Sequence, residues 1–469
     1  MGPKLMATVL TGLTLCTFVI ASSQITDADI VCDVCIIGGG SAGTYTAINL
    51  QKQGLSVVVV EKQDRLGGHT ETYTDPFTGA HDDIGVVVWH NITVATEYFA
   101  HFNISLAPVL TTLNFSYLDF STGKPVPGFV PPNPSAALKA YTEQLEKYPY
   151  IREGYYLPDP VPSDLLLPFG DFVQKYNLGG IVLQIAWLIC EGAGDILQHP
   201  TLYIAKLFGL DTIKSMETAF VTTARGDNSL LYEAALAELG SNVLLNSTVI
   251  STDRISDPDY ASITVSTPSG QQLIKAKTIV LAIPPELDNL AGWDLSDQEI
   301  GLFVEFTNSA YYTCLINNTG ISPNQDFTNI GNNRLYNLPR LPATYTITQS
   351  TIPGLFDVKY ASTTNLSTAQ VQANILADLE NLKDAGEING TSLAPNFVIF
   401  KSHTPFLLTV PTHAIQGGFY KLLYALQGQR KTFYTGAAWQ TEDSSLIWRF
   451  TRNLLPSIVK ATVDATLEE

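Results

Sequence analysis

A glycine-rich turn near the start of the chain constrains the fold more than any other feature. Residues 38–43 read Gly-Gly-Gly-Ser-Ala-Gly and follow an apolar run, 30–37, that is typical of a buried strand. A helical pattern over 41–53 comes next, and the β-branched run 56–60 then ends at Glu61. The sequence therefore predicts a strand–helix–strand unit in a parallel sheet that is covered on both faces.

The spacing of the glycines fits a turn that binds a dinucleotide. Gly38 permits the tight turn, Gly40 lets the backbone approach a pyrophosphate, and Gly43 allows the helix to pack closely on the strand. The helix N-terminus stabilises the negative charge, and an acid at the end of the second strand can bind a ribose hydroxyl. The alternative is a plain glycine-rich turn beside an unrelated surface acid. From this unit we predict a cofactor set of Gly38, Gly40, Ser41, Ala42, Gly43, Glu61 and Lys62.

The segments that follow resemble the flavin-containing amine oxidase superfamily. The resemblance lies in Arg65-Leu66-Gly67-Gly68-His69, in 83–85, in Gly226 with the helix and Val249 after it, in 278–285 and in 434–438. It implies an α/β fold with a Rossmann-type FAD-binding domain of the glutathione-reductase/amine-oxidase kind and a discontinuous α+β substrate domain. It also implies that FAD is lined by Arg65, Gly67, Gly68 and His69, that the backbone of Val249 meets the adenine, and that Gly436, Ala437 and Trp439 lie under the isoalloxazine.

Two positions depart from that superfamily pattern. His69 stands where an arginine is usual, and Ala437 stands where an acid is usual. The Ser-Gly-Gly-Cys-Tyr segment to which some relatives attach their flavin is absent from the sequence. His69 is therefore either a covalent histidyl attachment site or a hydrogen-bonding histidine near the diphosphate.

The C-terminal stretch from Gly418 through 426–428 to Trp439 looks most like the fungal β-cyclopiazonate dehydrogenase group. This resemblance implies hydride abstraction from a small apolar metabolite, such as an indole alkaloid or terpenoid, coupled to oxidative ring closure. Three alternatives stay open: an amine or amino-acid oxidase that makes hydrogen peroxide, an FAD-dependent double-bond isomerase, and a non-catalytic flavin-binding protein. Hydride transfer needs few side chains, so no catalytic residue is nominated, and Tyr420, Trp439 and His403 are candidates for the pocket wall.

Changes in composition and in predicted secondary structure along the chain suggest how the domains are built. We expect an FAD-binding domain from residues 30–89, 220–300 and 410–469. The intervening segments, a mostly helical 90–219 and a strand-rich 301–409, are expected to form the substrate domain.

The first residues and the sequons favour the secretory route. Residues 1–23 resemble a cleaved signal peptide that leaves no membrane span, so the protein is expected to be secreted or lumenal. Predicted glycosylation sites are Asn91, Asn103, Asn114, Asn246, Asn317, Asn365 and Asn389. The net charge of -18 argues against nucleic acid as a partner. The pair Cys32 and Cys35 is expected to be buried and not part of a metal site.

Overall fold

Two sheets organise the protein. The computed structural model describes residues 2, 28–109, 115–389 and 394–467. The sheet nearer the chain start has the strand order β10-β11-β12-β1-β2-β9, and β19 pairs with β12. Its strands are β1 (Ile30–Ile37), β2 (Val57–Val60), β9 (Val243–Leu244), β10 (Thr248–Asp253), β11 (Ala261–Thr267), β12 (Gly270–Leu281) and β19 (Thr432–Tyr434). Since β1 pairs in parallel with both β2 and β12, the predicted strand–helix–strand unit is present at the centre of this sheet.

The second sheet has the order β17-β13-β16-β15-β14-β6-β7, with β18 paired to β13. Its strands are β6 (Phe115–Asp119), β7 (Lys124–Pro125), β13 (Thr307–Asn317), β14 (Asp326–Asn329), β15 (Ala343–Gln349), β16 (Phe356–Ser362), β17 (Asn396–Ser402) and β18 (Phe406–Thr409). Two small ribbons, β3 (Thr72–Thr74) with β4 (His81–Asp83) and β5 (Leu106–Val109) with β8 (Phe220–Thr223), stand beside the two sheets.

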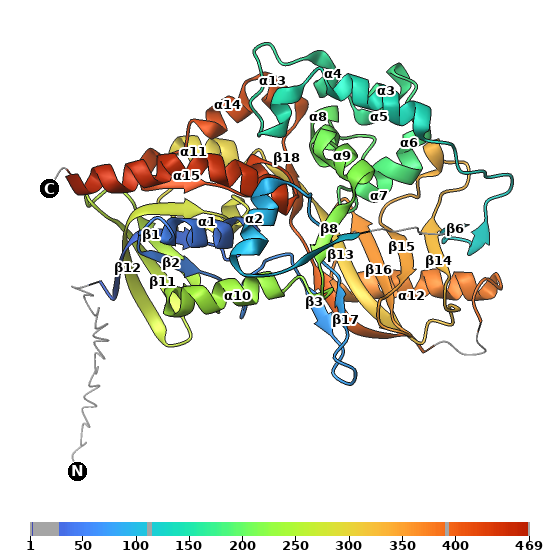
Figure 1. Ribbon diagram of the computed structural model, residues 1–469, viewed down its shortest axis with the longest axis horizontal. Coiled ribbons are helices and arrows are strands. Elements are labelled where there is room, and N and C mark those ends of the chain that lie inside the picture. Colours follow the sequence, from blue (N-terminus) through green and yellow to red (C-terminus); the bar gives the residue numbers. More distant parts are fainter. Residues whose placement is uncertain (1, 3–27, 110–114, 390–393, 468–469) are drawn as a thin grey trace.

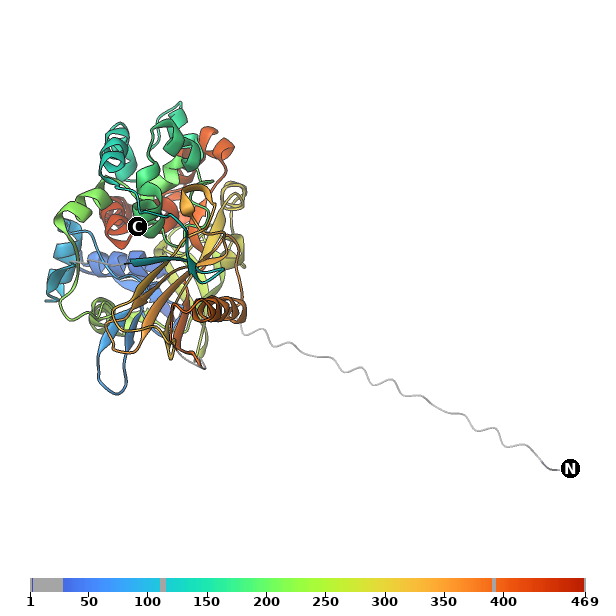
Figure 2. The same cartoon turned by 90° about the vertical axis from the view of Figure 1, so that its right-hand side faces the viewer.

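Helices cover both sheets. Helix α15 packs against α1 and β12 of the first sheet, and the apolar face of α12 packs on the second sheet. Figures 1 and 2 both show the short helices of residues 135–218 gathered on one side of the molecule. The α-helices are α1 (Ser41–Gln51), α2 (Thr93–His101), α3 (Ser135–Leu145), α4 (Ser163–Leu166), α5 (Phe169–Lys175), α6 (Gly179–Ile181), α7 (Trp187–Ile189), α8 (Thr201–Leu207), α9 (Leu210–Thr218), α10 (Leu230–Leu239), α11 (Asp297–Phe303), α12 (Thr368–Asp384), α13 (Thr412–Gln416), α14 (Phe419–Tyr424) and α15 (Ser444–Leu467).

Two strand boundaries differ from the sequence prediction. The pattern predicts one strand over 243–250, but the structure has β9 and β10, which lie at opposite edges of the first sheet. It also predicts separate strands over 272–275 and 278–283, but β12 runs without a break from Gly270 to Leu281. The strand is continuous because β12 has three neighbours along its length. It pairs with β11 over Gly270–Ala276, with β1 over Ile274–Leu281 and with β19 over Ile279–Leu281.

Arg254 joins three parts of the first sheet region. Its side chain is fully buried, and Nη1 and Nη2 lie 2.7 and 3.0 Å from the two carboxylate oxygens of Glu299 in α11. Its Nε lies 2.9 Å from Asp294 Oδ1, and Tyr434 of β19 donates a hydrogen bond of 2.5 Å to Glu299. Burial alone would raise the pKa of Glu299, but the hydrogen bonds from Arg254, Ser296 and Tyr434, together with the charge of Arg254, outweigh it and lower the pKa to about 2.

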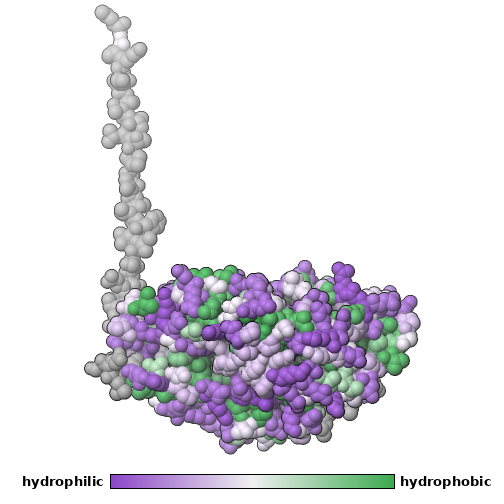
Figure 3. Space-filling model, turned by 90° about the horizontal axis from the view of Figure 1, so that it is seen from above, coloured by the Kyte–Doolittle hydropathy of each residue, from purple (hydrophilic) through white to green (hydrophobic). Residues whose placement is uncertain are grey.

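The strands of the first sheet come from three separate stretches of chain, 30–60, 243–281 and 432–434. The strands of the second sheet come from residues 115–125 and 307–409, which lie between those stretches. We keep the division into an FAD-binding and a substrate domain as a proposal. The face in Figure 3 is largely hydrophilic, with apolar residues scattered over it. In the described ranges, none of the helices has both the length and the apolar character needed to cross a bilayer. The predicted signal, 1–23, lies outside the described residues except for position 2.

Candidate functional site

The turn between β1 and α1 is bound by the acid at the end of β2. The Gly39 amide donates to Glu61 Oε2 at 2.6 Å, and the Gln63 amide donates to Glu61 Oε1 at 2.7 Å. The Gly67 amide donates to the Gly39 carbonyl at 2.9 Å. The structure thus brings together the first glycine turn, the predicted ribose-binding acid and the second glycine pair, which are separated by up to 28 residues in the sequence.

Close backbone approach makes the glycines of this site hard to replace. A Cβ added at Gly43 would lie 1.8 Å from the Gly38 carbonyl oxygen. Gly68 has a φ of +56°, and a Cβ there would lie 3.0 Å from Gly40 Cα. Gly436 has a φ of +111° and lies beside Ala42 of α1. Three segments of chain therefore come close together at glycines, which contribute no side chains of their own.

Buried hydroxyls near these glycines fit the diphosphate of a dinucleotide. Ser41 Oγ, Thr70 Oγ1 and Tyr232 Oη are buried, and none of them makes a hydrogen bond within the described part of the chain. Burial raises the pKa of Tyr232, and the nearby hydroxyls of Ser41, Thr70 and Ser444 act in the opposite direction, which shows that the four groups converge. Ser41 and Ser444 begin helices α1 and α15, so two helix N-termini add positive potential. Unpartnered hydroxyls beside two helix N-termini fit what two phosphates require.

The sequence interpretation missed Thr70, Tyr232 and Ser444. Thr70 follows the second glycine pair directly, and Ser444 precedes the C-terminal helical pattern, so both carried a local signal. Tyr232 carried none, because it comes from α10 and reaches the site only through its packing against Gly67.

Arg65 is engaged by its own loop. Its Nη1 donates to the Thr70 carbonyl at 2.9 Å and its Nη2 to the Gly68 carbonyl at 2.9 Å, and it pairs with Glu71. Its role in this structure is to hold the glycine loop. Whether it also contacts the cofactor stays a prediction, as do the contacts of Lys62.

The remaining predicted cofactor residues lie at the two ends of the same region. Ser247, just before β10, donates its amide to the Glu61 carbonyl at 2.9 Å, which places the segment leading to Val249 beside the predicted ribose-binding acid. At the other end, the Trp439 indole stacks on Tyr434 with ring centroids 5.1 Å apart, and its Nε1 has no hydrogen-bond partner among the residues that the structure describes.

A wall of neutral rings stands beside the second glycine pair. His69 meets His403 edge to face at 5.0 Å and stacks on Phe406 at 6.3 Å. Tyr311 of β13 contacts both His403 and Phe406. Burial lowers the pKa of His69 to about 4 and holds the pKa of His403 well below its usual value, so both imidazoles are neutral near pH 7.

Of the three pocket candidates, only His403 belongs to this wall. Tyr420 stacks on Tyr155 with centroids 3.9 Å apart, and its hydroxyl donates to Tyr203 at 2.8 Å, so it lies in a separate aromatic cluster. Trp439 is fully buried on the C-terminal turn. Tyr311 and Phe406 are wall residues that the sequence interpretation did not name.

Comparison with known proteins identifies the family of the chain. A family model described as NAD(P)-binding Rossmann-like domain matches residues 36–102. The chain is 40% identical over 441 residues to an FAD-dependent oxidoreductase of Cochliobolus heterostrophus, which covers 91% of both chains. It is 33% identical over 440 residues to β-cyclopiazonate dehydrogenase of Aspergillus flavus, which covers 92% of this chain and 93% of the relative. The chain belongs to the β-cyclopiazonate dehydrogenase family of FAD-dependent oxidoreductases.

Solved structures show the same fold at low identity. A fatty acid isomerase from P. acnes that produces CLA superposes with a TM-score of 0.72 at 18% identity, covering 91% of this chain and 98% of that one. Cyclohexylamine oxidase from Brevibacterium oxydans superposes with a TM-score of 0.64 at 16% identity, covering 93% and 100%. The predictions of an amine-oxidase-type α/β fold, of FAD as cofactor and of an oxidoreductase are confirmed.

In this family member, the hydroxyl of Tyr232 should contribute to FAD affinity. We expect Tyr232→Phe to weaken FAD binding about tenfold, because the loss of one hydrogen bond to a charged group costs about 1.5 kcal/mol. Titration of the apoprotein with FAD, followed by flavin fluorescence, measures the change. Tyr156→Phe, at a ring that is 53% exposed, is the control and should bind like the parent. Equal affinity in both variants would contradict the assignment of Tyr232 to the diphosphate site.

The carboxyl of Glu442, which follows the C-terminal turn, makes the stability of the protein depend on pH. Burial raises its pKa from 4.5 to about 7, against one hydrogen bond from the Leu407 amide at 3.1 Å. Between those two values the folded carboxyl keeps a proton that the unfolded one has lost, so its contribution to stability falls as pH rises through this window. The fall amounts to at most about 3 kcal/mol.

We therefore expect Glu442→Gln to stabilise the protein at about pH 8 and to leave it unchanged at about pH 4.5. Melting temperatures across this range measure the difference. Glu380→Gln, at a carboxyl whose side chain is 54% exposed, is the control and should give no pH-dependent difference. A Glu442→Gln difference that is flat with pH would show that the carboxyl titrates normally.

The remaining predicted sites are placed as follows. Asn91, Asn103, Asn246, Asn365 and Asn389 are exposed, Asn317 is partly buried, and Asn114 lies outside the described residues. Glycosylation at these positions stays a prediction. Cys32 and Cys35 are both buried, and burial raises the pKa of Cys32 to about 12. In the described part of the chain, no cluster of three or more histidine, cysteine, aspartate or glutamate side chains could hold a metal ion.

Proposed function

We propose that this enzyme abstracts a hydride from a small apolar secondary metabolite, of indole alkaloid or terpenoid type, and that the oxidation is coupled to ring closure. The observation that carries the proposal is the neutral aromatic wall of His69, His403, Phe406 and Tyr311 beside the FAD-binding surface. The name of the β-cyclopiazonate dehydrogenase relatives supports the same class of chemistry. An apolar substrate loses little hydration free energy when it binds against these rings. An ammonium ion in the same place would meet no counter-charge on the four rings.

The residues of the site prepare this reaction by binding and by excluding water. FAD, when bound, supplies the hydride acceptor. The glycine turns and the hydroxyls of Ser41, Thr70 and Tyr232 would hold its diphosphate, and Glu61 would bind its ribose. The wall rings would hold a substrate C–H in a dry environment. The substrate gives up two electrons and one hydrogen as hydride, and ring closure by an internal nucleophile then releases one proton.

The carboxylate of Glu191, which lies behind the wall, can take up that proton. Tyr311 donates from its hydroxyl to Glu191 at 3.3 Å, and Lys359 lies 3.2 Å from the same Glu191 oxygen. The Tyr311 hydroxyl is thus linked through Glu191 to a lysine that is 24% exposed, which gives a short route from the wall to solvent.

Anaerobic mixing with candidate biosynthetic intermediates tests the proposal. The expected result is loss of the oxidised-flavin absorbance and a cyclised product that lacks two hydrogens. Tyr311→Phe should slow the removal of the proton that ring closure releases, and it should therefore lower turnover. It should leave FAD binding unchanged. If the flavin stays oxidised with prenylated indoles and with terpenoids alike, the proposal fails.

The other candidate reactions give different readouts in the same assays. An amine or amino-acid oxidase would release hydrogen peroxide with primary amines or amino acids. An isomerase would return a product of unchanged mass. A non-catalytic flavin-binding protein would be reduced by none of these compounds. Acid precipitation distinguishes a covalent His69 linkage, because colour then stays in the pellet, whereas free FAD remains in the supernatant.

We also propose that the protein is made in the secretory pathway. The apolar N-terminal segment and the five exposed sequons described above support it. Digestion of the natively produced protein with an N-glycosidase should lower its apparent mass, and an unchanged mass together with an intact N-terminus would refute this proposal.

A further inference from the structure

A buried lysine lies directly behind the C-terminal glycine turn. Lys206 of α8 is 4% exposed. Its Nζ donates to the Ile151 carbonyl at 2.7 Å and to the Gly154 carbonyl at 3.4 Å, and it also donates to the Gln440 side-chain oxygen. The ammonium lies 4.9 Å from the centroid of the Tyr155 ring, as in a cation–π contact. Every partner of Lys206 is therefore an uncharged group.

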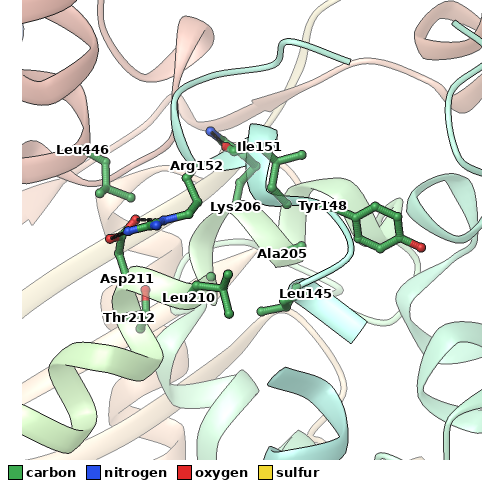
Figure 4. A pocket seen from close by; sticks show the side chains of 11 residues that line it. Leu145, Tyr148, Ile151, Arg152, Ala205, Lys206, Leu210, Asp211, Thr212 and Leu446 are labelled. Atoms are coloured by element: carbon green, nitrogen blue, oxygen red, sulfur yellow. Dashed lines mark hydrogen bonds and ion pairs between the residues drawn. The ribbon is translucent and has the colours of Figure 1, made fainter. Parts of the chain in front are cut away.

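The neighbouring charges are already paired with one another. Asp211 binds Arg152 at 2.6 Å and Arg449 at 2.9 Å, and Figure 4 shows Arg152 turned toward Asp211 and not toward Lys206. The pocket lined by Arg152, Lys206 and Asp211, among others, has a volume of about 20 Å³, which is room for about one water molecule. Within the described ranges, Lys206 has no carboxylate at ion-pair distance. Its charge is thus not cancelled by direct contact.

The hydrogen bonds of Lys206 indicate that it is protonated. A neutral amine has two N–H groups, whereas the Nζ of Lys206 faces three acceptors and an aromatic ring. Burial and the charge of Arg449 lower the pKa of Lys206, and Glu153 and Asp211 act in the opposite direction. A neutral Lys206 would leave one carbonyl without its donor, so the geometry favours the ammonium.

Gln440 links this ammonium to the turn predicted to lie under the isoalloxazine. The Gln440 amide donates to the Gly436 carbonyl at 3.2 Å and to the Ala437 carbonyl at 3.1 Å. Its side-chain nitrogen donates to the Arg152 carbonyl at 2.8 Å, which fixes the side-chain oxygen toward Lys206. Helix α15 begins at Ser444, so the positive end of a 24-residue helix faces the same turn.

We propose that Lys206 is a positioning residue that sets the redox potential of the bound FAD. Its positive charge, held behind the Gly436–Gln440 turn, favours the reduced cofactor, because reduction adds negative charge to the isoalloxazine. Ala437 carries no carboxylate, so no negative charge at this position of the turn opposes the field of Lys206 at the isoalloxazine. The proposal rests on the predicted placement of the isoalloxazine over this turn.

The midpoint potential of the bound FAD tests this role without any substrate. A single charge behind the turn should change the equilibrium constant for reduction about tenfold. For a two-electron couple this corresponds to about 30 mV. We expect Lys206→Met to lower the potential by that amount, and Gln440→Glu to lower it similarly, because the new carboxylate would pair with the ammonium. Lys206→Arg, which keeps the positive charge, should have the same potential as the parent.

Lys383→Met is the matched control, since Lys383 lies on α12 with a partly exposed side chain paired to Glu380. It should leave the potential unchanged. If Lys206→Met loses FAD, Gln440→Glu decides the question. Potentials of Lys206→Met and Gln440→Glu equal to that of the parent would overturn the proposal, and so would a folded Gln440→Glu protein that no longer binds FAD, which would show a purely structural role. Failure of the hydride-transfer proposal would leave these potentials unaffected.

Discussion

Replacement of Gly43 by alanine is expected to abolish FAD binding and to destabilise the protein by more than about 3 kcal/mol. A Cβ at this position would lie 1.8 Å from the Gly38 carbonyl oxygen and 3.0 Å from its carbon. Both atoms belong to the backbone of the turn, so no side-chain rotation relieves the overlap. Helix α1 must move away from β1, and the amides that face the diphosphate move with it. Flavin absorbance of the purified protein and a urea titration measure the two effects.

Gly301 supplies the matched control for this substitution. It lies inside helix α11, and a Cβ there would meet no atom within 4 Å. Gly301→Ala should stabilise the protein by about 0.5 to 1 kcal/mol and leave FAD binding intact. A yellow and stable Gly43→Ala protein would show that the turn does not need close helix–strand packing.

The second large effect is expected at Arg254. Arg254→Met should destabilise the protein by about 3 to 5 kcal/mol, because it leaves the carboxylate of Glu299 buried without its partner. Glu299 is 2% exposed and also accepts a hydrogen bond from Tyr434. The loss should therefore loosen β19 from β12 as well as α11 from β10. The free energy of unfolding from denaturant titration measures the effect.

Arg452 provides a surface ion pair for comparison. It pairs with Glu97 while 40% of its own side chain and 60% of the partner's are exposed. Arg452→Met should cost less than about 1 kcal/mol. The double variant Arg254→Met/Glu299→Leu should recover part of the stability lost in Arg254→Met, and no recovery would indicate that Arg254 acts through packing alone.

The first third of the cofactor site could be predicted from sequence because it is local. The glycine turn, α1 and Glu61 lie within 24 residues, and each carries a distinct signal of conformational freedom, periodicity or charge. The same reasoning failed over 243–283. Strand patterns report burial and not pairing, so they did not show that β9 and β10 occupy opposite edges or that β12 changes partners along its length.

The other parts of the site depend on contacts between distant segments. Tyr232, Tyr311 and Lys206 come from α10, β13 and α8, and each reaches the site only through tertiary packing. As single residues in helical or strand patterns they resemble ordinary core residues. Their roles became visible only when burial, unpartnered polar atoms and acceptor counts could be read from the structure.

The order in which the site is assembled has a consequence for biosynthesis. The site predicted to receive the diphosphate begins at Gly38 but is completed by Gly436, Ser444 and Trp448, whose indole donates to the Ser41 carbonyl at 3.2 Å. A growing polypeptide on the ribosome therefore cannot acquire its flavin until translation has passed these codons. Until then the nascent β1–α1 segment has its binding amides uncovered, and loading of the cofactor becomes a late checkpoint for the finished chain.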